Sequence, residues 1–543
     1  MLRKIIFFPK NTLFVLVLSM ALLLHCTPTE QPAPKAQIYT IILAGGTIFD
    51  GTGSDSIVAD IGIIGERIAA IGDLSGERAG LRLDVQGLAV VPGFIDIHSH
   101  ADSRRADRGG ITLLPQAENE LRQGVTTVIG GADGGSPYPL GEYLGYLDAV
   151  PAAINFGAFI GQGTIRRQVM GNENLVPTED ELAKMQTLVE QAMQEGAFGL
   201  SSGLKYVPGA YSTTEEVIAL AKIAAKYNGI YISHMRDEGL QIIESVKETI
   251  RIGEEGGLPT QITHHKIIGA KMWGNSVETL RLVDEARARG VDVSMDQYPY
   301  TASSTGISVL MPRWSLEGDS TAVRARLRDP ETRARIKKEI IFNLVEDRGG
   351  GDPANVVVAH CRWDTSLDGM NLSEILRMRG RAVNVENAAD LVMEIQEKGG
   401  ASGIFHAMSE DDLKRIMQHP YTMHASDGGI PTPGIGVPHP RNYGTFPRVL
   451  GHYVREQKVI GFSEAIRKMA GLPAWRLGLQ NRGVLKIGAV ADIAVLDREK
   501  IIDRATFSKP HQYSEGVQHV FVAGKAALLN GKITGVRAGK VLR

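Results

Sequence analysis

Eight short apolar segments alternate with helical segments through the middle of the chain. A helical spacing of apolar residues lies between most of them, for example at residues 178–195 and 214–226. Parallel strands need a crossover connection, usually a helix, so this alternation predicts a parallel sheet. Eight strand–helix units predict an α/β fold, the (β/α)8 or TIM barrel. The candidate strands are residues 94–98, 127–131, 153–159, 197–201, 230–234, 259–264, 291–295 and 421–425.

The segments on either side of the barrel have a different pattern. Residues 38–91 and 481–543 contain short apolar runs separated by glycine-rich turns, which is typical of β-strands. We therefore predict a small β-sandwich domain built from both termini, with the barrel at residues 92–480. A long excursion after the seventh strand, at about residues 301–357, predicts an inserted lid or substrate-facing subdomain.

The first 37 residues have the pattern of an export signal followed by a tether. A short basic region precedes the mostly apolar residues 5–24, and Cys26 follows. This pattern predicts a signal peptide over residues 1–26, and residues 23–26 resemble a bacterial lipobox. His25 departs from the small residue usual before the lipidated cysteine, and an uncleaved signal anchor is the alternative. Residues 27–37, rich in proline and polar side chains, predict a flexible tether.

This N-terminal pattern predicts where the protein works. We expect an exported lipoprotein on the periplasmic side or the cell surface of a bacterium. The lipid on Cys26 would be its only contact with the membrane. Acidic and basic residues nearly balance, at 61 and 59, for a net charge of -2. Because nucleic-acid binding needs a basic surface, we expect a small-molecule partner and no nucleic acid. The sequence leaves the oligomeric state open.

Metal-ligating residue types follow several of the predicted strands. Two histidines one residue apart end the first strand, and neighbours at i and i+2 on a strand project side by side. Imidazole nitrogen and carboxylate oxygen both bind zinc. The carboxyl ends of barrel strands form one mouth, where active sites are built. A lone histidine at a strand end is more often structural, but ligands after five strands together predict a metal site. The candidates are His98, His100, Asp133, His234, His264 and Asp427.

Longer motifs connect these candidates to a known family. The Pro-Gly-Phe-Ile-Asp run at residues 92–96, with the ligand order along the strands, resembles the amidohydrolase superfamily of metal-dependent hydrolases. More narrowly, the chain resembles the N-acyl-D-amino-acid deacylase (D-aminoacylase) family from about residue 40 to residue 531. The segments that carry this narrower resemblance are residues 199–206, 234–238, 264–266, 296–300 and 439–441.

The resemblance implies that the ligands form two metal positions. Asp133, His234 and His264 would hold a tightly bound Zn²⁺. His98, His100 and Asp427 would form a second, weaker position. Relatives commonly have cysteine in place of Asp133, so the preferred metal stays open, as does the question of whether Asp133 bridges two ions. The resemblance favours His264 over the adjacent His265 as the ligand. It does not support Lys205 as a carboxylated bridging lysine.

The resemblance also implies a reaction. A metal lowers the pKa of bound water towards neutrality, and Asp427 would act as general acid and base. The enzyme would hydrolyse the amide bond of an N-acyl-D-amino acid and give a carboxylate and a D-amino acid. Two alternatives remain: a dipeptidase or cyclic-amide hydrolase of the dihydroorotase or hydantoinase kind, and, less favoured, a non-catalytic metal-binding lipoprotein. The side chains implied to bind the substrate carboxylate are Lys266, Tyr298, Ser304 and Arg441.

Overall fold

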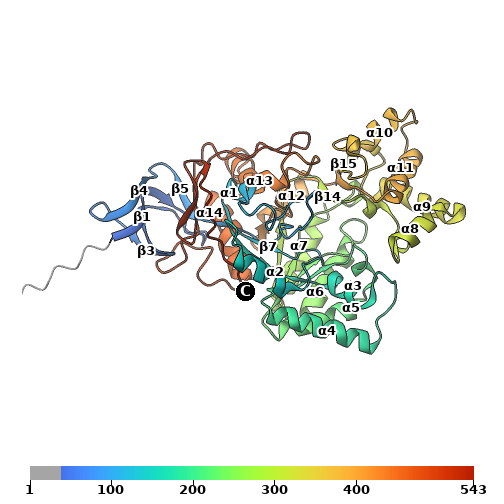
Figure 1. Ribbon diagram of the computed structural model, residues 1–543, viewed down its shortest axis with the longest axis horizontal. Helices are drawn as coiled ribbons and strands as arrows, with labels where there is room; N and C mark the ends of the chain where they lie inside the picture. Colours follow the sequence, from blue (N-terminus) through green and yellow to red (C-terminus); the bar gives the residue numbers. More distant parts are fainter. Residues whose placement is uncertain (1–37) are drawn as a thin grey trace, which may run out of the picture. The chain divides into compact units, whose positions relative to one another are not determined.

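A parallel barrel forms the centre of the computed structural model, which describes residues 38–543 (Figure 1). All eight predicted strands are present in this part of the chain, and their side chains are buried on both faces, as in parallel sheets covered by helices. The predicted α/β barrel fold is therefore confirmed. The strands are β6 (Phe94–Asp96), β7 (Val125–Gly130), β8 (Asn155–Ala158) continued by β9 (Ile160–Gly161), β10 (Gly199–Gly203), β11 (Ile230–His234), β12 (Thr260–Ile262), β13 (Val293–Gln297) and β17 (Thr422–His424).

Backbone hydrogen bonds close the barrel between its first and last strands. Ser99 and Gly428 form a parallel bridge just beyond β6 and β17. The Asp427 N–H donates to the His98 carbonyl oxygen at 2.9 Å. This closure matters for function because it brings the residues that follow strands one and eight into direct contact.

Helices pack around the barrel on the strand connections. Helix α4 begins with a capping box, in which Thr178 and Glu181 satisfy each other's backbone N–H groups. The covering helices are α1 (Glu118–Leu121), α2 (Leu140–Ala149), α3 (Gln162–Met170), α4 (Glu179–Gln194), α5 (Thr214–Ala225), α6 (Ile242–Gly256), α7 (Ser276–Ala288), α12 (Glu410–Gln418), α13 (Arg441–Arg448), α14 (Phe462–Ile466) and α15 (Leu472–Arg476). None of the described helices is both long and apolar enough to cross a membrane.

Strands from both ends of the chain share one sheet, at the blue end of the ribbon (Figure 1). The order among the described strands is β21-β20-β19-β18-β5-β1-β2-β3, with β4 pairing β1. The junction between the two halves is the antiparallel pair of β5 and β18. The strands are β1 (Ile38–Ile48), β2 (Ile57–Ile64), β3 (Arg67–Gly72), β4 (Arg78–Asp84), β5 (Ala89–Pro92), β18 (Ile493–Leu496), β19 (Val517–Val522), β20 (Lys525–Leu529) and β21 (Lys532–Ile533).

The last residues of the chain leave this sheet and reach the barrel. The Phe156 N–H donates to the Lys540 carbonyl oxygen at 3.0 Å, and the Leu542 N–H donates to the Phe156 carbonyl oxygen at 2.7 Å. Strand β10 begins only at Gly199, so the start of β8 would otherwise lack a partner on that side. The C-terminal segment pairs these backbone groups, which would be costly to bury unpaired.

The inserted unit is larger than the predicted range of about 301–357. Strands β14 (Ser303–Gly306), β16 (Ser402–Phe405) and β15 (Val356–His360) form their own antiparallel sheet, in that order. The sheet packs with helices α8 (Ser320–Arg328), α9 (Pro330–Phe342), α10 (Leu372–Met378) and α11 (Val385–Glu397) around a separate apolar core. The unit therefore extends to about residue 405, because β16 pairs with β14 and β15 rather than with the barrel. The predicted signal peptide, Cys26 and the tether lie outside the described residues.

Candidate active site

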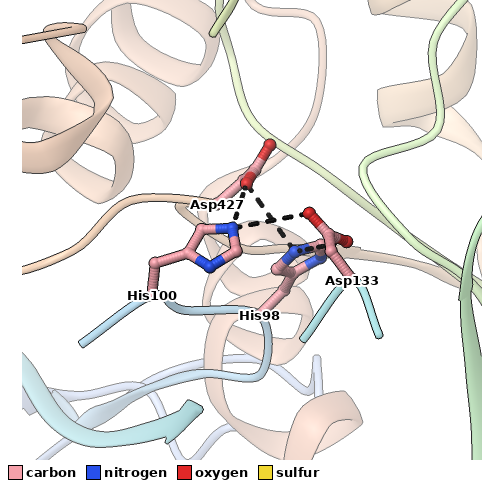
Figure 2. A group of neighbouring side chains, drawn as sticks. All are labelled: His98, His100, Asp133 and Asp427. Carbon is pink, nitrogen blue, oxygen red and sulfur yellow. Dashed lines mark hydrogen bonds and ion pairs between the residues drawn. The ribbon is translucent and has the colours of Figure 1, made fainter. Parts of the chain in front are cut away.

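The predicted metal ligands converge at the carboxyl ends of the barrel strands. The predicted ligands form two overlapping groups, and within each group the ligand atoms all lie within 4.8 Å of one another. The first contains His98, His100, Asp133 and Asp427, which Figure 2 shows pointing towards one another. The second contains Asp133, His234 and His264. The structure thus brings together all six predicted ligands, and the two groups match the division implied by the family resemblance except that Asp133 belongs to both.

Asp133 lies between four imidazole rings. Its Oδ1 atom is 3.3 Å from His98 Nε2 and 3.4 Å from His264 Nε2. Its Oδ2 atom is 3.4 Å from His100 Nε2 and 3.7 Å from His234 Nδ1. Two ligands about 2.1 Å from one tetrahedral ion lie about 3.4 Å apart, so these separations suit shared coordination. Each oxygen of the carboxylate faces one histidine of each group, so Asp133 is the residue through which the two groups meet.

Several of these ligand atoms have no hydrogen-bond partner in the described chain although they are buried. They are His98 Nε2, His234 Nδ1, His264 Nε2 and Asp133 Oδ1. A buried polar atom left unsatisfied costs free energy of about 1–3 kcal/mol. Converging nitrogen and oxygen lone pairs without donors fit a cation, so the residues present fit a metal ion.

The backbone is strained at three of the ligands. Asp133, His264 and Asp427 have positive φ angles of 53°, 36° and 49°. Non-glycine residues adopt this left-handed region uncommonly, and such strain persists where the surrounding structure holds it in place. Each of the three residues lies two or three positions after the end of its strand, so the left-handed conformation occurs in the short turns that carry these ligands.

Electrostatics at this mouth favour positive charge. Burial lowers the pKa of His98, but Asp133 and Asp296 outweigh burial and hold that pKa well above its usual range. Burial also lowers the pKa of His100, but its hydrogen-bonding contacts with Asp133 and Asp427 outweigh burial and raise this pKa to about 9. Burial raises the pKa of Asp133, yet His98 and His264 keep it well below its ordinary value. Metal binding releases such protons, since the cation takes over the stabilising positive charge.

The pKa of His234 is shifted in the opposite direction to those of His98 and His100. Its ring is buried, and burial lowers its pKa to about 4. The imidazole is therefore neutral near pH 7, the form that binds metals. His265, the alternative to its neighbour His264 as a predicted ligand, belongs to neither ligand group, and its Nε2 atom lies 2.8 Å from Thr279 Oγ1.

Asp427 is held from two sides. Its Oδ1 atom is 3.1 Å from His100 Nε2, and its Oδ2 atom accepts a hydrogen bond from Arg441 Nη1 at 2.7 Å. Burial raises its pKa, but Arg441 and the neighbouring histidines lower it below the ordinary value. The side chain is thus ionised near pH 7, as a proton acceptor must be.

Two of the four predicted substrate-binding residues, Arg441 and Lys266, lie against the ring of a third, Tyr298. The buried Tyr298 ring lies 4.9 Å from the Arg441 guanidinium carbon and 5.6 Å from Lys266 Nζ. Arg441 Nη2 donates to the Ser304 carbonyl oxygen at 3.3 Å. Lys266 Nζ donates to the His264 carbonyl oxygen at 3.0 Å. The structure therefore places cations and a hydroxyl beside the predicted metal ligands, although Ser304 contributes its backbone oxygen to this contact.

Three further buried charges at the site had no predicted role. Glu238 contacts His264 and Lys266, and Asp296 Oδ1 accepts the His264 N–H at 2.7 Å. Both lie in segments that carried the family resemblance, Glu238 after strand β11 and Asp296 near the end of strand β13, and this was the available signal. Arg348 comes from the inserted unit and lies 3.5 Å from Glu238. No local pattern marked Arg348, because its place depends on how the insertion folds back.

Lys205 lies outside the ligand groups. Its Nζ atom donates to Asp237 Oδ2 at 3.2 Å and to Asp347 Oδ2 at 3.3 Å. These ion pairs engage the ammonium group away from the histidines, which agrees with the expectation that Lys205 is no bridging ligand.

A (β/α)8 barrel with histidine and aspartate ligands at its mouth defines the class of metal-dependent hydrolases. Comparison with protein families and known proteins specifies the branch. The model of the Amidohydrolase family matches residues 83–337 and 341–527. The chain is 37% identical to the D-aminoacylase of Alcaligenes xylosoxydans xylosoxydans over 530 residues, covering 93% of this chain and 98% of the relative.

Solved structures give the same result. A crystal structure of D-aminoacylase superposes with a TM-score of 0.79 at 35% identity and covers 93% of this chain and 100% of its own. N-acyl-D-glutamate deacylase from Bordetella bronchiseptica, solved with zinc and a phosphonate mimic of the tetrahedral intermediate, also superposes with a TM-score of 0.79. It is 32% identical to this chain and covers 93% of this chain and 100% of its own. The chain belongs to the amidohydrolase family, in its N-acyl-D-amino-acid deacylase (D-aminoacylase) branch. The predicted membership is confirmed.

Proposed function

We propose that this protein hydrolyses the amide bond of N-acyl-D-amino acids and releases a carboxylate and a D-amino acid. The observation that carries the proposal is the convergence of Asp427, Arg441 and Lys266 on the histidine–aspartate cluster around Asp133. The full-length similarity to D-aminoacylase supports the same reaction. A ring-opening activity has less support, because the chain is 24% identical to the dihydroorotase of Lactobacillus gasseri and 37% identical to D-aminoacylase.

We infer that the cluster holds Zn²⁺, one ion tightly at Asp133, His234 and His264, with a weaker position at His98, His100 and Asp427. When bound, a metal ion supplies an activated water molecule and polarises the carbonyl of the amide. Zinc in the related N-acyl-D-glutamate deacylase supports this choice of metal. Histidine and carboxylate ligands both suit zinc, and Asp133 in place of a thiolate makes the set harder.

Asp427 moves the proton in this scheme. The water oxygen forms a bond to the amide carbon, and its proton passes to the ionised carboxylate of Asp427. The carbon–nitrogen bond then breaks as Asp427 returns that proton to the leaving amine. Arg441 holds the carboxylate of Asp427 at 2.7 Å, which keeps its orientation through both transfers.

The substrate carboxylate would bind among Lys266, Arg441, Tyr298 and Ser304. Arginine can hold a carboxylate through two parallel hydrogen bonds, and lysine adds a point charge. Both cations are buried and each already has one carboxylate partner, Asp427 for Arg441 and Glu238 for Lys266, so a substrate carboxylate would bind to their remaining N–H groups. This supports a preference for acyl amino acids over simple amides.

A panel of substrates tests the proposal. Purified protein is assayed on N-acetyl-D- and N-acetyl-L-amino acids, dipeptides, hydantoins and dihydroorotate, with and without added zinc. We expect zinc-dependent hydrolysis of the D series, with the L series slower by about 100-fold, a ratio that differential contacts in one site can produce. Hydrolysis confined to the L series, or to the cyclic amides, would refute the proposal.

We also propose export and lipid anchoring, supported by the pattern of residues 1–37 alone. A lipid on Cys26 would hold the enzyme at a bacterial membrane on the periplasmic side or the cell surface. In membrane fractionation of the expressing bacterium, the wild type should sediment with membranes, and Cys26→Ala should move mainly to another fraction. Equal membrane association of both proteins would exclude a lipid on Cys26 as the anchor.

A further inference from the structure

Glu238 is a fully buried carboxylate that connects two parts of the site. It follows His234 by four residues in the loop after β11, and its side chain has no exposed surface. An isolated buried charge is costly, so its partners must compensate for the lost hydration. Those partners are the predicted metal ligands His234 and His264 on one side and the cations Lys266 and Arg348 on the other.

Each oxygen of Glu238 faces one histidine and one cation. Its Oε1 atom lies 3.0 Å from His264 Nδ1 and accepts a short hydrogen bond from Lys266 Nζ. Its Oε2 atom lies 3.5 Å from Arg348 Nη2 and 3.7 Å from His234 Nε2. The last distance is too long for a direct hydrogen bond, so the strongest coupling runs through Oε1.

Two groups with opposite preferences lie at His264 Nδ1. His264 presents Nε2 to Asp133, and this nitrogen can bind a cation only if the proton sits on Nδ1. Lys266 Nζ, 2.8 Å from Nδ1, can only donate to it, which favours the proton on Nε2. Glu238 Oε1, 3.0 Å from Nδ1, can accept the Nδ1–H and also binds the Lys266 ammonium, so Glu238 is the partner that favours the tautomer with Nε2 free.

The same oxygen anchors Lys266. Without a carboxylate between them, the Lys266 ammonium would sit beside His264 and a bound cation, and like charges would repel. Glu238 offsets that repulsion and keeps Lys266 Nζ beside the Tyr298 ring, where the substrate carboxylate is proposed to bind. Metal site and substrate site are therefore joined through one side chain.

We propose that Glu238 is a positioning residue: it orients His264 towards the metal and holds Lys266 for the substrate carboxylate. The part that concerns Lys266 rests on the proposed function, whereas the part that concerns His264 does not. Carboxylate partners of ligating histidines typically affect metal affinity by 10- to 100-fold. The role of Glu238 in metal binding can therefore be measured without turnover.

The test compares Glu238→Gln with the wild type as full-length, metal-stripped protein. Glutamine keeps the size of the side chain but removes its charge. Zinc titration against a competing chromophoric chelator should show a dissociation constant raised about 10- to 100-fold. At saturating zinc, KM for an N-acetyl-D-amino acid should rise more than kcat falls, because Lys266 loses its anchor.

Glu216→Gln is the matched control. Glu216 is also buried, and it pairs with Arg166, Gln162 and Ser212, none of which is a site residue. The zinc affinity of the Glu216→Gln protein should stay within threefold of the wild-type affinity. Glu238→Asp keeps the buried charge and so protects the fold, and its affinity should lie between wild type and Glu238→Gln.

Two results would overturn the inference. One is zinc affinity of both Glu238 variants within threefold of the wild type. The other is an equal loss in Glu216→Gln, which would reveal a general effect of removing buried charge. Failure of the wild type to hydrolyse any N-acyl-D-amino acid would refute the proposed function and the substrate-binding role of Lys266, and the zinc titration would still decide the role of Glu238 at His264.

Discussion

Replacing Asp427 by asparagine is expected to lower kcat for an N-acetyl-D-amino acid by about a thousandfold, within the range for loss of general acid–base catalysis. Asparagine has nearly the same shape and can still accept the hydrogen bond from Arg441, but it cannot take a proton from water. Its effect should therefore fall on kcat far more than on KM. Steady-state kinetics at saturating zinc measures both constants.

Asp412→Asn is the control for this change. Asp412 is a buried aspartate paired with Arg415 at 3.2 Å on helix α12, and it has no contact with the ligand cluster. Its kcat should remain close to that of the wild type. Circular dichroism and zinc content should show that Asp427→Asn is folded and keeps its tight metal. A kcat above a tenth of the wild-type value would rule out Asp427 as the principal proton acceptor.

Replacing Asp133 by asparagine is expected to abolish tight zinc binding and most activity. Asp133 is the ligand that the two groups share, and its carboxylate faces four histidines at 3.3–3.7 Å. Asparagine removes the negative charge that balances a cation. A metal contributes several kcal/mol to such a transition state, and 4 kcal/mol corresponds to about a thousandfold in rate. Metal analysis after dialysis and assays at limiting zinc measure the two losses.

Asp133→Cys separates the loss of a ligand from damage to the loop. A thiolate is a strong zinc ligand, so this variant should retain one zinc ion and substantial activity. If Asp133 also bridges a second ion, the cysteine variant should bind that second ion more weakly than the wild type. Full zinc occupancy in Asp133→Asn at wild-type affinity would contradict the central place of Asp133.

Local pattern was sufficient for the barrel and for most of its ligands. Strand residues are buried on both faces and appear as continuous apolar runs, and the residue after each run must lie at the barrel mouth. His98, His234, His264 and Asp427 could therefore be placed together from their positions along the chain. The left-handed backbone of Asp133, His264 and Asp427 could not be predicted, since nothing in their neighbours requires it.

The inserted unit shows where local pattern was insufficient. Its extent was underestimated because β16 is a short apolar run that could belong to either sheet, and only its pairing with β14 and β15 decides. Arg348 reaches Glu238 from this unit across 110 positions of sequence. Such contacts depend on long-range packing, which leaves no periodic signal along the chain.

The sequence by itself determined the fold class, the family and the residues that converge on the barrel mouth. The fold class and the converging residues follow from strand periodicity and chain order, which fix the side chains that follow each parallel strand, whereas the family follows from the resemblance of the motifs. The tertiary structure alone decided the relations among those residues: Asp133 shared between two ligand groups, Asp427 held by Arg441, and Glu238 joining His264 to Lys266. These relations are distances between groups on different strands and loops, and only the closed barrel with its insertion sets them.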